Sequence, residues 1–327
     1  MDSGDVGKAN LASVSICARV SEELAEPLGG SAPRAAAWLL IEQTGPWGPR
    51  ALTESHFHPE LGRELQEITR GTGVEVALIR RPGRHADCPP TGERTVHLAH
   101  TAPGRSWIRT AQLADPHILR DLDFAAIGSG EHGGFGTAHE GDPLALVCTN
   151  GRRDRCCALL GRPLASELAA AGHAEVWEVT HLGGHRFAPT MLVLPYGYTY
   201  GRLTAPTAKE VLEATHHGRI VAEFCRGRSC WDRPGQAAEL AVRQNHAVED
   251  AEALTVTQAP DPAAPTDPDR WSVRVEHTDG RMWQAEVRRT AAAPARPESC
   301  LKAPTTPDRY DVVSLTGLPA QVCPTPA

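Results

Sequence analysis

The sequence lacks a hydrophobic run long enough to cross a membrane. No window reaches the about 18 consecutive apolar residues of a spanning helix, and the first residues (MDSGDVGKANLASVS) have no apolar stretch typical of a signal peptide. Positive charge is not in excess either, because 33 Lys and Arg face 40 Asp and Glu, a net charge of −7. This balance argues against a surface for nucleic acid or anionic membranes. We expect a cytoplasmic protein whose partners are proteins or small molecules.

What is present is an ordinary globular composition. The chain has 327 residues, of which 41% are hydrophobic and 22% charged, so it is long enough for two domains and is neither fibrous nor wholly disordered. It also has nine cysteines. In a cytosolic chain these are more often metal ligands, redox groups or buried thiols than a disulfide framework, and the odd number leaves at least one unpaired.

Two stretches of the chain repeat the same order of expected elements. The first begins at Trp38 with WLLIEQ and the second at Leu144 with LALVCT, and each continues with a Gly-containing loop, a helical stretch and a further strand. Two more short strands and a closing helix follow, so each half has the order β-α-β-β-β-α. A sheet covered by helices in this order is typical of a thioredoxin-like unit. We predict an α/β protein with two tandem thioredoxin-like units, at residues 17–127 and 143–225.

The remaining segments join or follow these units. Residues 128–142 (GSGEHGGFGTAHEGD) contain the pattern G-x-G-x-x-G, but a helical stretch precedes it and a strand follows, which is the reverse of a dinucleotide site. We interpret this segment as a Gly-rich linker. Residues 226–327 are predicted to form a C-terminal helix, a Pro- and Ala-rich linker, a β-hairpin appendage around Asp279-Gly280 and a tail.

Cysteines and histidines follow two neighbouring strands of the second unit. Cys148 closes one expected strand, and the next strand ends at His181-Leu-Gly-Gly-His185, where two glycines predict a loop that turns both rings toward one point. Because the two strands of a βαβ unit are parallel, their ends lie at the same edge of the sheet. The residues expected to converge there are Cys148, Cys157, His181 and His185. Cys156 is the alternative to Cys157.

This set of residues is compatible with more than one chemistry. Two thiolates and two imidazoles can bind one Zn²⁺ or a 2Fe-2S cluster. The H-x₃-H spacing suits zinc, whereas the eight residues between the cysteines depart from the short spacing of structural zinc sites and favour the cluster. A third hypothesis is a thiol-disulfide redox protein that uses Cys156 and Cys157, although no C-x-x-C is present there. The cysteines expected to be small buried apolar residues are Cys17, Cys225, Cys230 and Cys300.

Three segments carry a resemblance to a known family. They are residues 26–48 (EPLGGSAPRAAAWLLIEQTGPWG), 148–157 (CTNGRRDRCC) and 181–203 (HLGGHRFAPTMLVLPYGYTYGRL). The chain resembles the sucrase/ferredoxin-like proteins over about residues 17–325. The resemblance implies a thioredoxin-like ferredoxin domain whose 2Fe-2S cluster is held by two cysteines and by the histidines of the H-x-x-x-H motif. The matching positions here are Cys148, Cys157, His181 and His185.

These residues predict an electron-transfer protein. Two neutral imidazoles leave an oxidised 2Fe-2S centre less negative than four thiolates do, so we expect a raised reduction potential, and the outer ring nitrogens would make it pH-dependent. The arginines that could dock an acidic redox protein partner are Arg152, Arg153, Arg155 and Arg186. The alternative is a solvated loop in which Asp154 pairs with an arginine.

The sequence gives no argument for the transformation of a substrate. No nucleophile–base pair or phosphate loop can be identified, and no carboxylate pair supports sucrase activity. The first unit has no cysteine at the strand end Ile41-Glu42-Gln43. A redox carrier is therefore favoured over an enzyme, and a Cys₂His₂ zinc-binding structural or interaction protein is the alternative.

Overall fold

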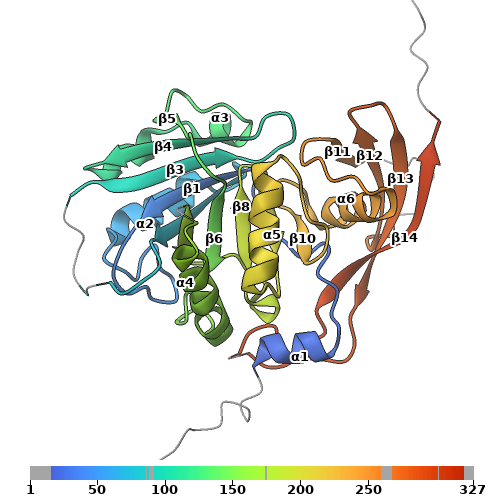
Figure 1. Cartoon of the computed structure of the whole chain (residues 1–327), viewed down its shortest axis with the longest axis horizontal. Coiled ribbons are helices and arrows are strands. Elements are labelled where there is room, and N and C mark those ends of the chain that lie inside the picture. Colours follow the sequence, from blue (N-terminus) through green and yellow to red (C-terminus); the bar gives the residue numbers. More distant parts are fainter. Residues whose placement is uncertain are drawn as a thin grey trace, which may run out of the picture.

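A ten-stranded mixed sheet forms the centre of the computed structural model, and a four-stranded antiparallel sheet lies beside it (Figure 1). The structure describes residues 16–85, 87, 92–173, 175–258, 267–300 and 302–319. In spatial order the large sheet contains β10 (Cys225–Arg228), β9 (Tyr198–Tyr200), β8 (Met191–Leu194), β6 (Leu144–Cys148), β7 (Val176–Val179), β2 (Val74–Arg80), β1 (Ala37–Glu42), β3 (Arg94–His100), β4 (Trp107–Leu113) and β5 (Thr137–Ala138). The α/β class is confirmed, with one large mixed sheet.

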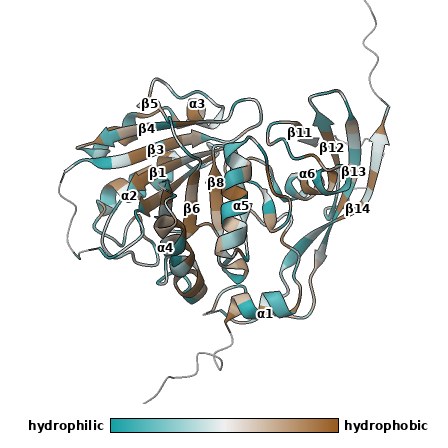
Figure 2. Ribbon diagram, in the orientation of Figure 1, coloured by the Kyte–Doolittle hydropathy of each residue, from teal (hydrophilic) through white to brown (hydrophobic). Residues whose placement is uncertain are grey.

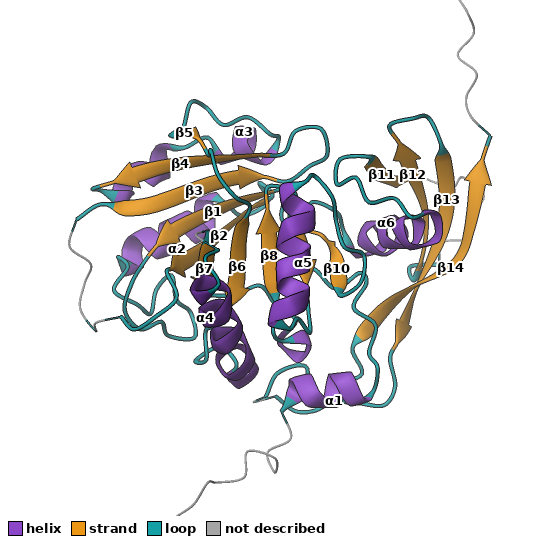
Figure 3. Cartoon of the chain, in the orientation of Figure 1, coloured by secondary structure: helices purple, strands orange, loops and turns teal. Residues whose placement is uncertain are grey.

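Helices connect these strands (Figure 3). They are α1 (Cys17–Glu23), α2 (Pro59–Ile68), η2 (Pro116–Asp121), α3 (Phe124–Gly128), η3 (Cys157–Gly161), α4 (Arg162–Ala170), η4 (His185–Phe187), α5 (Ala205–His216) and α6 (Arg233–His246). Several begin at sequence signals for a helix start. Asp123 and Thr204 accept hydrogen bonds at the N-termini of α3 and α5, and Pro59 stands in the first turn of α2.

The two halves of the large sheet repeat one strand order. In the first half the helix α2 connects β1 to β2, and these two strands pair in parallel. β3 pairs with the other side of β1 in the antiparallel direction. In the second half β6 pairs in parallel with β7 across α4, and β8 joins β6 in the antiparallel sense. The order β2-β1-β3-β4 of one half therefore corresponds to the order β7-β6-β8-β9 of the other.

The halves meet edge to edge rather than as two separate sheets. β2 and β7 are antiparallel, with Ile79 opposite Val179 and Arg80 opposite Glu178. The Arg80 guanidinium lies 2.7 Å from a Glu178 carboxylate oxygen, and both side chains are buried. The Gly-rich segment predicted as a linker runs along the other side of the first half, where its short strand β5 pairs with β4.

The central strands of the large sheet are largely hydrophobic (Figure 2), and alternating residues of these strands belong to different core clusters. Ala145 and Val147 of β6 pack with Leu164 and Leu168 of α4 in one cluster. A corresponding cluster in the first half joins β1, β2 and β3 to α2 and α3. The opposite set of strand residues, which includes Trp38, Cys148 and Trp177, forms a third cluster that continues across both halves. The apolar residues thus make the seam between the halves part of the core.

The C-terminal region has more strands than its composition predicts. The hairpin predicted around Asp279-Gly280 is present as β12 (Arg270–His277) and β13 (Met282–Ala291). β11 (Leu254–Gln258) and β14 (Asp308–Leu318) extend it to four strands, and α6 packs on this sheet. The strand β14 was not predicted, because its alternation is weak in a Pro-, Ala- and Thr-rich tail. Most of the predicted Pro- and Ala-rich linker, residues 259–266, lies outside the described residues.

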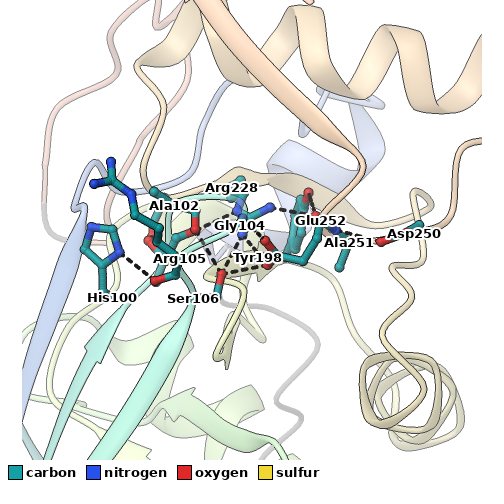
Figure 4. A network of polar contacts seen from close by, with 12 residues as sticks. His100, Ala102, Gly104, Arg105, Ser106, Tyr198, Arg228, Asp250, Ala251 and Glu252 are labelled. Carbon is teal, nitrogen blue, oxygen red and sulfur yellow. Dashed lines mark hydrogen bonds and ion pairs between the residues drawn. The ribbon is translucent and has the colours of Figure 1, made fainter. Parts of the chain in front are cut away.

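A buried arginine ties this region to both halves (Figure 4). The Arg228 guanidinium of β10 donates to Thr101 O at 2.7 Å, to Ala251 O at 2.6 Å, and to Ser106 Oγ and Glu252 Oε1, each at 2.9 Å. These partners belong to the loop after β3 and to the segment before β11. Arg228 therefore joins three parts of the chain that are far apart in sequence.

None of the helices in the described part of the chain has the length and hydrophobicity that a membrane-spanning helix needs.

Candidate metal centre

Two of the predicted ligands stand where β6 passes into its helix. Cys148 is the last residue of β6 and Cys157 the first of η3, and both are buried. Gly161 allows this close approach, because a Cβ at that position would overlap the carbonyl oxygen of Cys148. The sulfur atoms of Cys148 and Cys157 lie 3.4 Å apart. The prediction that this strand end and this helix start bring two thiols together agrees with the structure.

The two histidines lie on a loop that two glycines shape. Gly183 and Gly184 both adopt left-handed backbone angles, with φ of +66° and +67°. A Cβ at Gly184 would overlap the guanidinium of Arg226, whereas a Cβ at Gly183 has nothing within 4 Å. The ring centroids of His181 and His185 are 4.9 Å apart. The expected turn that directs both rings to one side is therefore present.

The four side chains form a row of neighbouring groups. Cys148 contacts Cys157, Cys157 Sγ lies 3.1 Å from His185 Nδ1, and the His185 ring lies beside that of His181. The imidazole of His181 is close enough to the Cys148 thiol to lower the pKa of that thiol. The Nδ1 atom of His181 is buried without a hydrogen-bond partner in the described part of the chain, and both rings are half-buried. His185 Nδ1 thus faces a thiol, and part of each ring lies near solvent.

The protonation of these groups is coupled. The hydrogen bond with Cys157 lowers the pKa of the Cys148 thiol well below its usual range, and His181 acts in the same direction against burial. The same hydrogen bond, together with burial, raises the pKa of Cys157. Burial lowers the pKa of His185, so its ring is neutral at neutral pH. One thiolate, one thiol and a neutral imidazole are groups that a thiophilic metal can bind with release of a proton.

Arg226 is a residue of this site that the sequence analysis did not identify. Its fully buried guanidinium lies under the glycine loop and donates to Gly183 O at 3.1 Å, to Ser31 Oγ at 3.1 Å and to Ser31 O. Burial lowers the pKa of Arg226 to about 9, and the charge of Cys148 opposes that shift. A buried cation beside two thiols offsets thiolate charge. The signal was the pair of arginines in CRGR, an unusual composition for a strand.

The adjacent cysteines Cys156 and Cys157 face different surroundings. Cys157 lies with Cys148 and His185, as above, whereas the sulfur of Cys156 lies 3.4 Å from that of Cys17 and 3.1 Å from that of Cys300. Cys17 is buried as predicted. The prediction of a buried apolar Cys300 is wrong, because its side chain is half-buried and contacts two other thiols. Its partners are remote in sequence, so no local pattern marks it.

The four arginines expected to dock a partner differ in their exposure to solvent. Arg152, Arg153 and Arg155 are exposed on the loop between the cysteines. Asp154 turns inward and accepts hydrogen bonds from Ser299 Oγ at 2.7 Å and from the backbone N–H groups of Cys156 and Cys300. The alternative in which Asp154 pairs with an arginine is therefore not what the structure has.

Arg186, expected at the docking rim, is buried in an ion network. Its Nε donates to Glu26 Oε1 at 2.7 Å and its Nη1 to Glu298 at 2.9 Å. The other oxygen of Glu26 accepts from Arg296 Nε at 2.8 Å. The network joins the residue after His185 to both ends of the described chain. Arg186 is therefore not an exposed docking residue, since its charge is paired inside the protein.

Comparisons with known proteins place the chain in a family. The family model described as Sucrase/ferredoxin-like matches residues 28–227, more than half of the chain, and the chain belongs to that family. A curated relative, altered inheritance of mitochondria protein 32 of Meyerozyma guilliermondii, is 28% identical over 97 residues. The match covers 26% of this chain and 34% of the relative, so the chain spans about a third of that relative's length. No solved structure matches the chain.

Proposed function

We propose that this chain is an electron carrier that holds one 2Fe-2S cluster. The ligands would be Cys148, Cys157, His181 and His185, through the two sulfur atoms and the two Nδ1 atoms. The observation that carries the proposal is a pair of thiols 3.4 Å apart beside a pair of histidine rings whose centroids are 4.9 Å apart. A cluster with two irons needs its ligands in two such pairs. Membership of the sucrase/ferredoxin-like family is consistent with this function.

Several features of the residues fit a metal group. His181 Nδ1 has no conventional hydrogen-bond partner in the described structure, although it is buried, and a buried imidazole nitrogen without a partner is costly. Cys156 is turned toward other thiols, which favours Cys157 as the second cysteine ligand. We also infer that each half of the large sheet is a thioredoxin-like unit, from the repeated strand order.

A cluster bound there would take up and release one electron. Centres with two histidine ligands have potentials of about −150 to +300 mV, against about −400 mV for all-thiolate plant-type ferredoxins. Arg226 and the neutral His185 would further favour the added negative charge. The half-buried rings let their outer nitrogens exchange protons with solvent, so the potential would fall as the pH rises. A potential that is constant between about pH 6 and pH 10 would contradict this coupling.

We propose that a redox protein docks at the cluster-bearing edge. Arg152, Arg153 and Arg155 are exposed on the loop between the two cysteine ligands, so an acidic partner would meet their charges first. Replacing all three by glutamine should slow electron exchange with an acidic partner at low salt and leave the cluster spectrum unchanged. Stopped-flow reduction at two salt concentrations measures this effect.

The first experiment is an absorption spectrum of protein purified without oxygen, with iron, sulfide and zinc measured on the same sample. The proposal requires about two iron and two sulfide per chain and visible bands that fade on reduction. Cys148→Ser and His185→Ala should remove both, whereas Cys225→Ser, at a cysteine buried in a different core cluster from the two thiol ligands, should retain them. A colourless chain with one zinc bound by these residues would instead support a Cys₂His₂ structural site.

The glycine loop offers a matched pair of variants. Gly183→Ala and Gly184→Ala impose nearly the same backbone strain, about 1 kcal/mol, because their φ angles are nearly equal. Only the Gly184 methyl group would overlap the Arg226 guanidinium. We expect Gly184→Ala to lose iron and Gly183→Ala to keep it, as measured by iron per folded chain. Equal iron contents would mean that Arg226 does not position the histidine loop.

A further inference from the structure

A second group of thiols lies beside the candidate centre and is not used by it. Cys17 comes from α1, Cys156 from the turn before η3, and Cys300 from the segment that follows β13. The three sulfur–sulfur distances are 3.4 Å for Cys17 to Cys156, 3.5 Å for Cys17 to Cys300 and 3.1 Å for Cys156 to Cys300. Each sulfur therefore contacts both of the others, although the three residues are more than a hundred positions apart in sequence.

The surroundings of this triangle are mostly dry. Cys17 and Cys156 are 1% and 0% exposed, and Ala18 and Ala188 pack against them. Cys300 is half-buried and forms the open side of the triangle. A single buried cysteine packs as a small apolar residue. Three sulfurs brought into mutual contact from three remote segments are instead the ligand type that selects soft metal ions.

A buried carboxylate faces the same point. Asp154 Oδ1 lies 4.0 Å from Cys17 Sγ, and one atom from each of Asp154, Cys17, Cys156 and Cys300 falls within 4.8 Å of all the others. The Asp154 side chain is 0% exposed and accepts three hydrogen bonds, from Ser299 Oγ and two backbone N–H groups. Among the described residues no salt bridge neutralises it. A buried carboxylate oxygen beside three thiols can supply the fourth ligand of a tetrahedral metal ion.

We propose that Cys17, Cys156, Cys300 and Asp154 form a second metal site that binds one Zn²⁺. Tetrahedral zinc with Zn–S bonds of about 2.3 Å requires sulfur atoms about 3.8 Å apart, so the edges of the triangle need to open by about 0.3 to 0.7 Å. Binding exchanges thiol protons for metal–sulfur bonds and involves no oxidation. A disulfide, in contrast, would use two of the sulfurs and leave the third and the carboxylate without a role.

The site would fasten α1 and the segment around Cys300 to the turn before η3. α1 and the segment around Cys300 lie side by side at the lower edge of the molecule in Figure 1, and the thiol of Cys156 contacts the thiols of Cys17 and Cys300. Zinc in a site of this kind stabilises the folded chain, because the unfolded chain does not bring the ligands together. The adjacent residues Cys156 and Cys157 would then belong to two different centres.

The test uses cobalt as a spectroscopic probe in the full chain. The Cys148→Ser variant, with the candidate cluster site disabled, is freed of metal under reducing, oxygen-free conditions and titrated with Co²⁺. We expect one cobalt per chain with the visible bands of tetrahedral coordination and the near-ultraviolet sulfur-to-cobalt absorption of three thiolates, displaced by one equivalent of Zn²⁺. Adding Cys300→Ser should abolish this signal, whereas adding Cys230→Ser, a cysteine outside both groups, should not.

A second readout uses the wild-type chain and does not depend on the fold of any variant. Alkylation followed by mass spectrometry should show that Zn²⁺ protects the peptides of Cys17, Cys156 and Cys300 together. Absence of cobalt binding in Cys148→Ser, an unchanged signal after Cys300→Ser, or a disulfide among the three cysteines that forms equally with and without zinc would each overturn the proposal. Iron and sulfide in the wild type are measured separately, so failure of this site is distinguishable from failure of the cluster proposal.

Discussion

The two halves of the large sheet share a strand order but differ at one strand end. Cys148 of β6 lies opposite Val179 of β7, and the corresponding register in the first half places Glu42 of β1 opposite Ile79 of β2. The helices that follow each approach another segment at a glycine, but at different places: a Cβ at Gly161 would overlap the carbonyl of Cys148 at the strand end, and one at Gly62 would overlap that of Leu52 in the loop before α2. The two halves thus share the strand order and register.

In the first half, the strand end that corresponds to the thiol site is followed by a buried polar side chain that the protein itself hydrogen-bonds. Gln43, which follows Glu42, is buried, and its Oε1 accepts from Arg94 Nη1 at 2.6 Å while its Nε2 donates to Thr44 O at 2.8 Å. The Gln43 carbonyl accepts from Trp47 Nε1 at 3.0 Å. These groups are satisfied by the protein itself, whereas the second half leaves His181 Nδ1 without a conventional hydrogen-bond partner and two thiols in contact. The comparison teaches that the frame does not decide the chemistry; the polar partners do.

The largest expected effect comes from breaking the seam between the halves. Glu178→Ala removes the partner of Arg80, which is buried with it, and should lower the free energy of unfolding by about 3 to 5 kcal/mol. Urea denaturation measures the loss. Glu67→Ala on α2 removes only an exposed pair with Arg70 at 2.7 Å, and should cost less than about 1 kcal/mol. Equal losses would show that the seam does not depend on the buried pair.

A smaller effect is expected inside the first half. Gln43→Leu leaves the buried guanidinium of Arg94 with one acceptor fewer, which should cost about 2 kcal/mol of unfolding free energy. Iron per folded chain should not change, since the substituted residue lies in the half without candidate ligands. A loss of iron that matches that of Cys148→Ser would mean that the two halves are functionally coupled.

Stability at the seam should also depend on pH. His97 of β3 lies edge-on to Trp177 of β7, with ring centroids 5.4 Å apart, and burial lowers its pKa to about 3. Because the unfolded chain binds a proton below about pH 6.5 and the folded chain does not, this stability is present above that pH and is lost as the pH falls, by about 1.4 kcal/mol per unit. His97→Gln should flatten the slope of unfolding free energy between pH 6.5 and 4. An unchanged slope would assign acid sensitivity to other groups.

Local patterns were enough to predict much of the second half. The apolar run that ends at Cys148, the start of a helix at Cys157 and the two glycines before His185 are all features of short segments, and each agrees with the structure. The pairing of β2 with β7 was not predictable, because periodicity identifies a strand but not which edge it meets. Within the described part of the chain, two residue pairs set the register of this seam.

Contacts between remote segments account for the other differences. The sequence analysis placed Arg186 on an exposed docking surface and did not single out Arg226. Both are buried, because their partners Glu26 and Ser31 come from a remote, early part of the chain. An arginine is buried only where such partners exist, and sequence spacing does not show them. The meeting of Cys300 with Cys17 has the same origin.

The ion network around Glu26 has a consequence for the order in which the protein is made. One carboxylate joins Arg186, next to His185, to Arg296, so the wall beside the histidine loop includes residues from the first and the last parts of the chain. During synthesis on the ribosome all four candidate ligands emerge before Arg296 does. The nascent chain therefore presents these ligands with that wall still open, and the arrival of the C-terminal segment closes it. A metal group held by the proposed ligands would enter most easily in that interval.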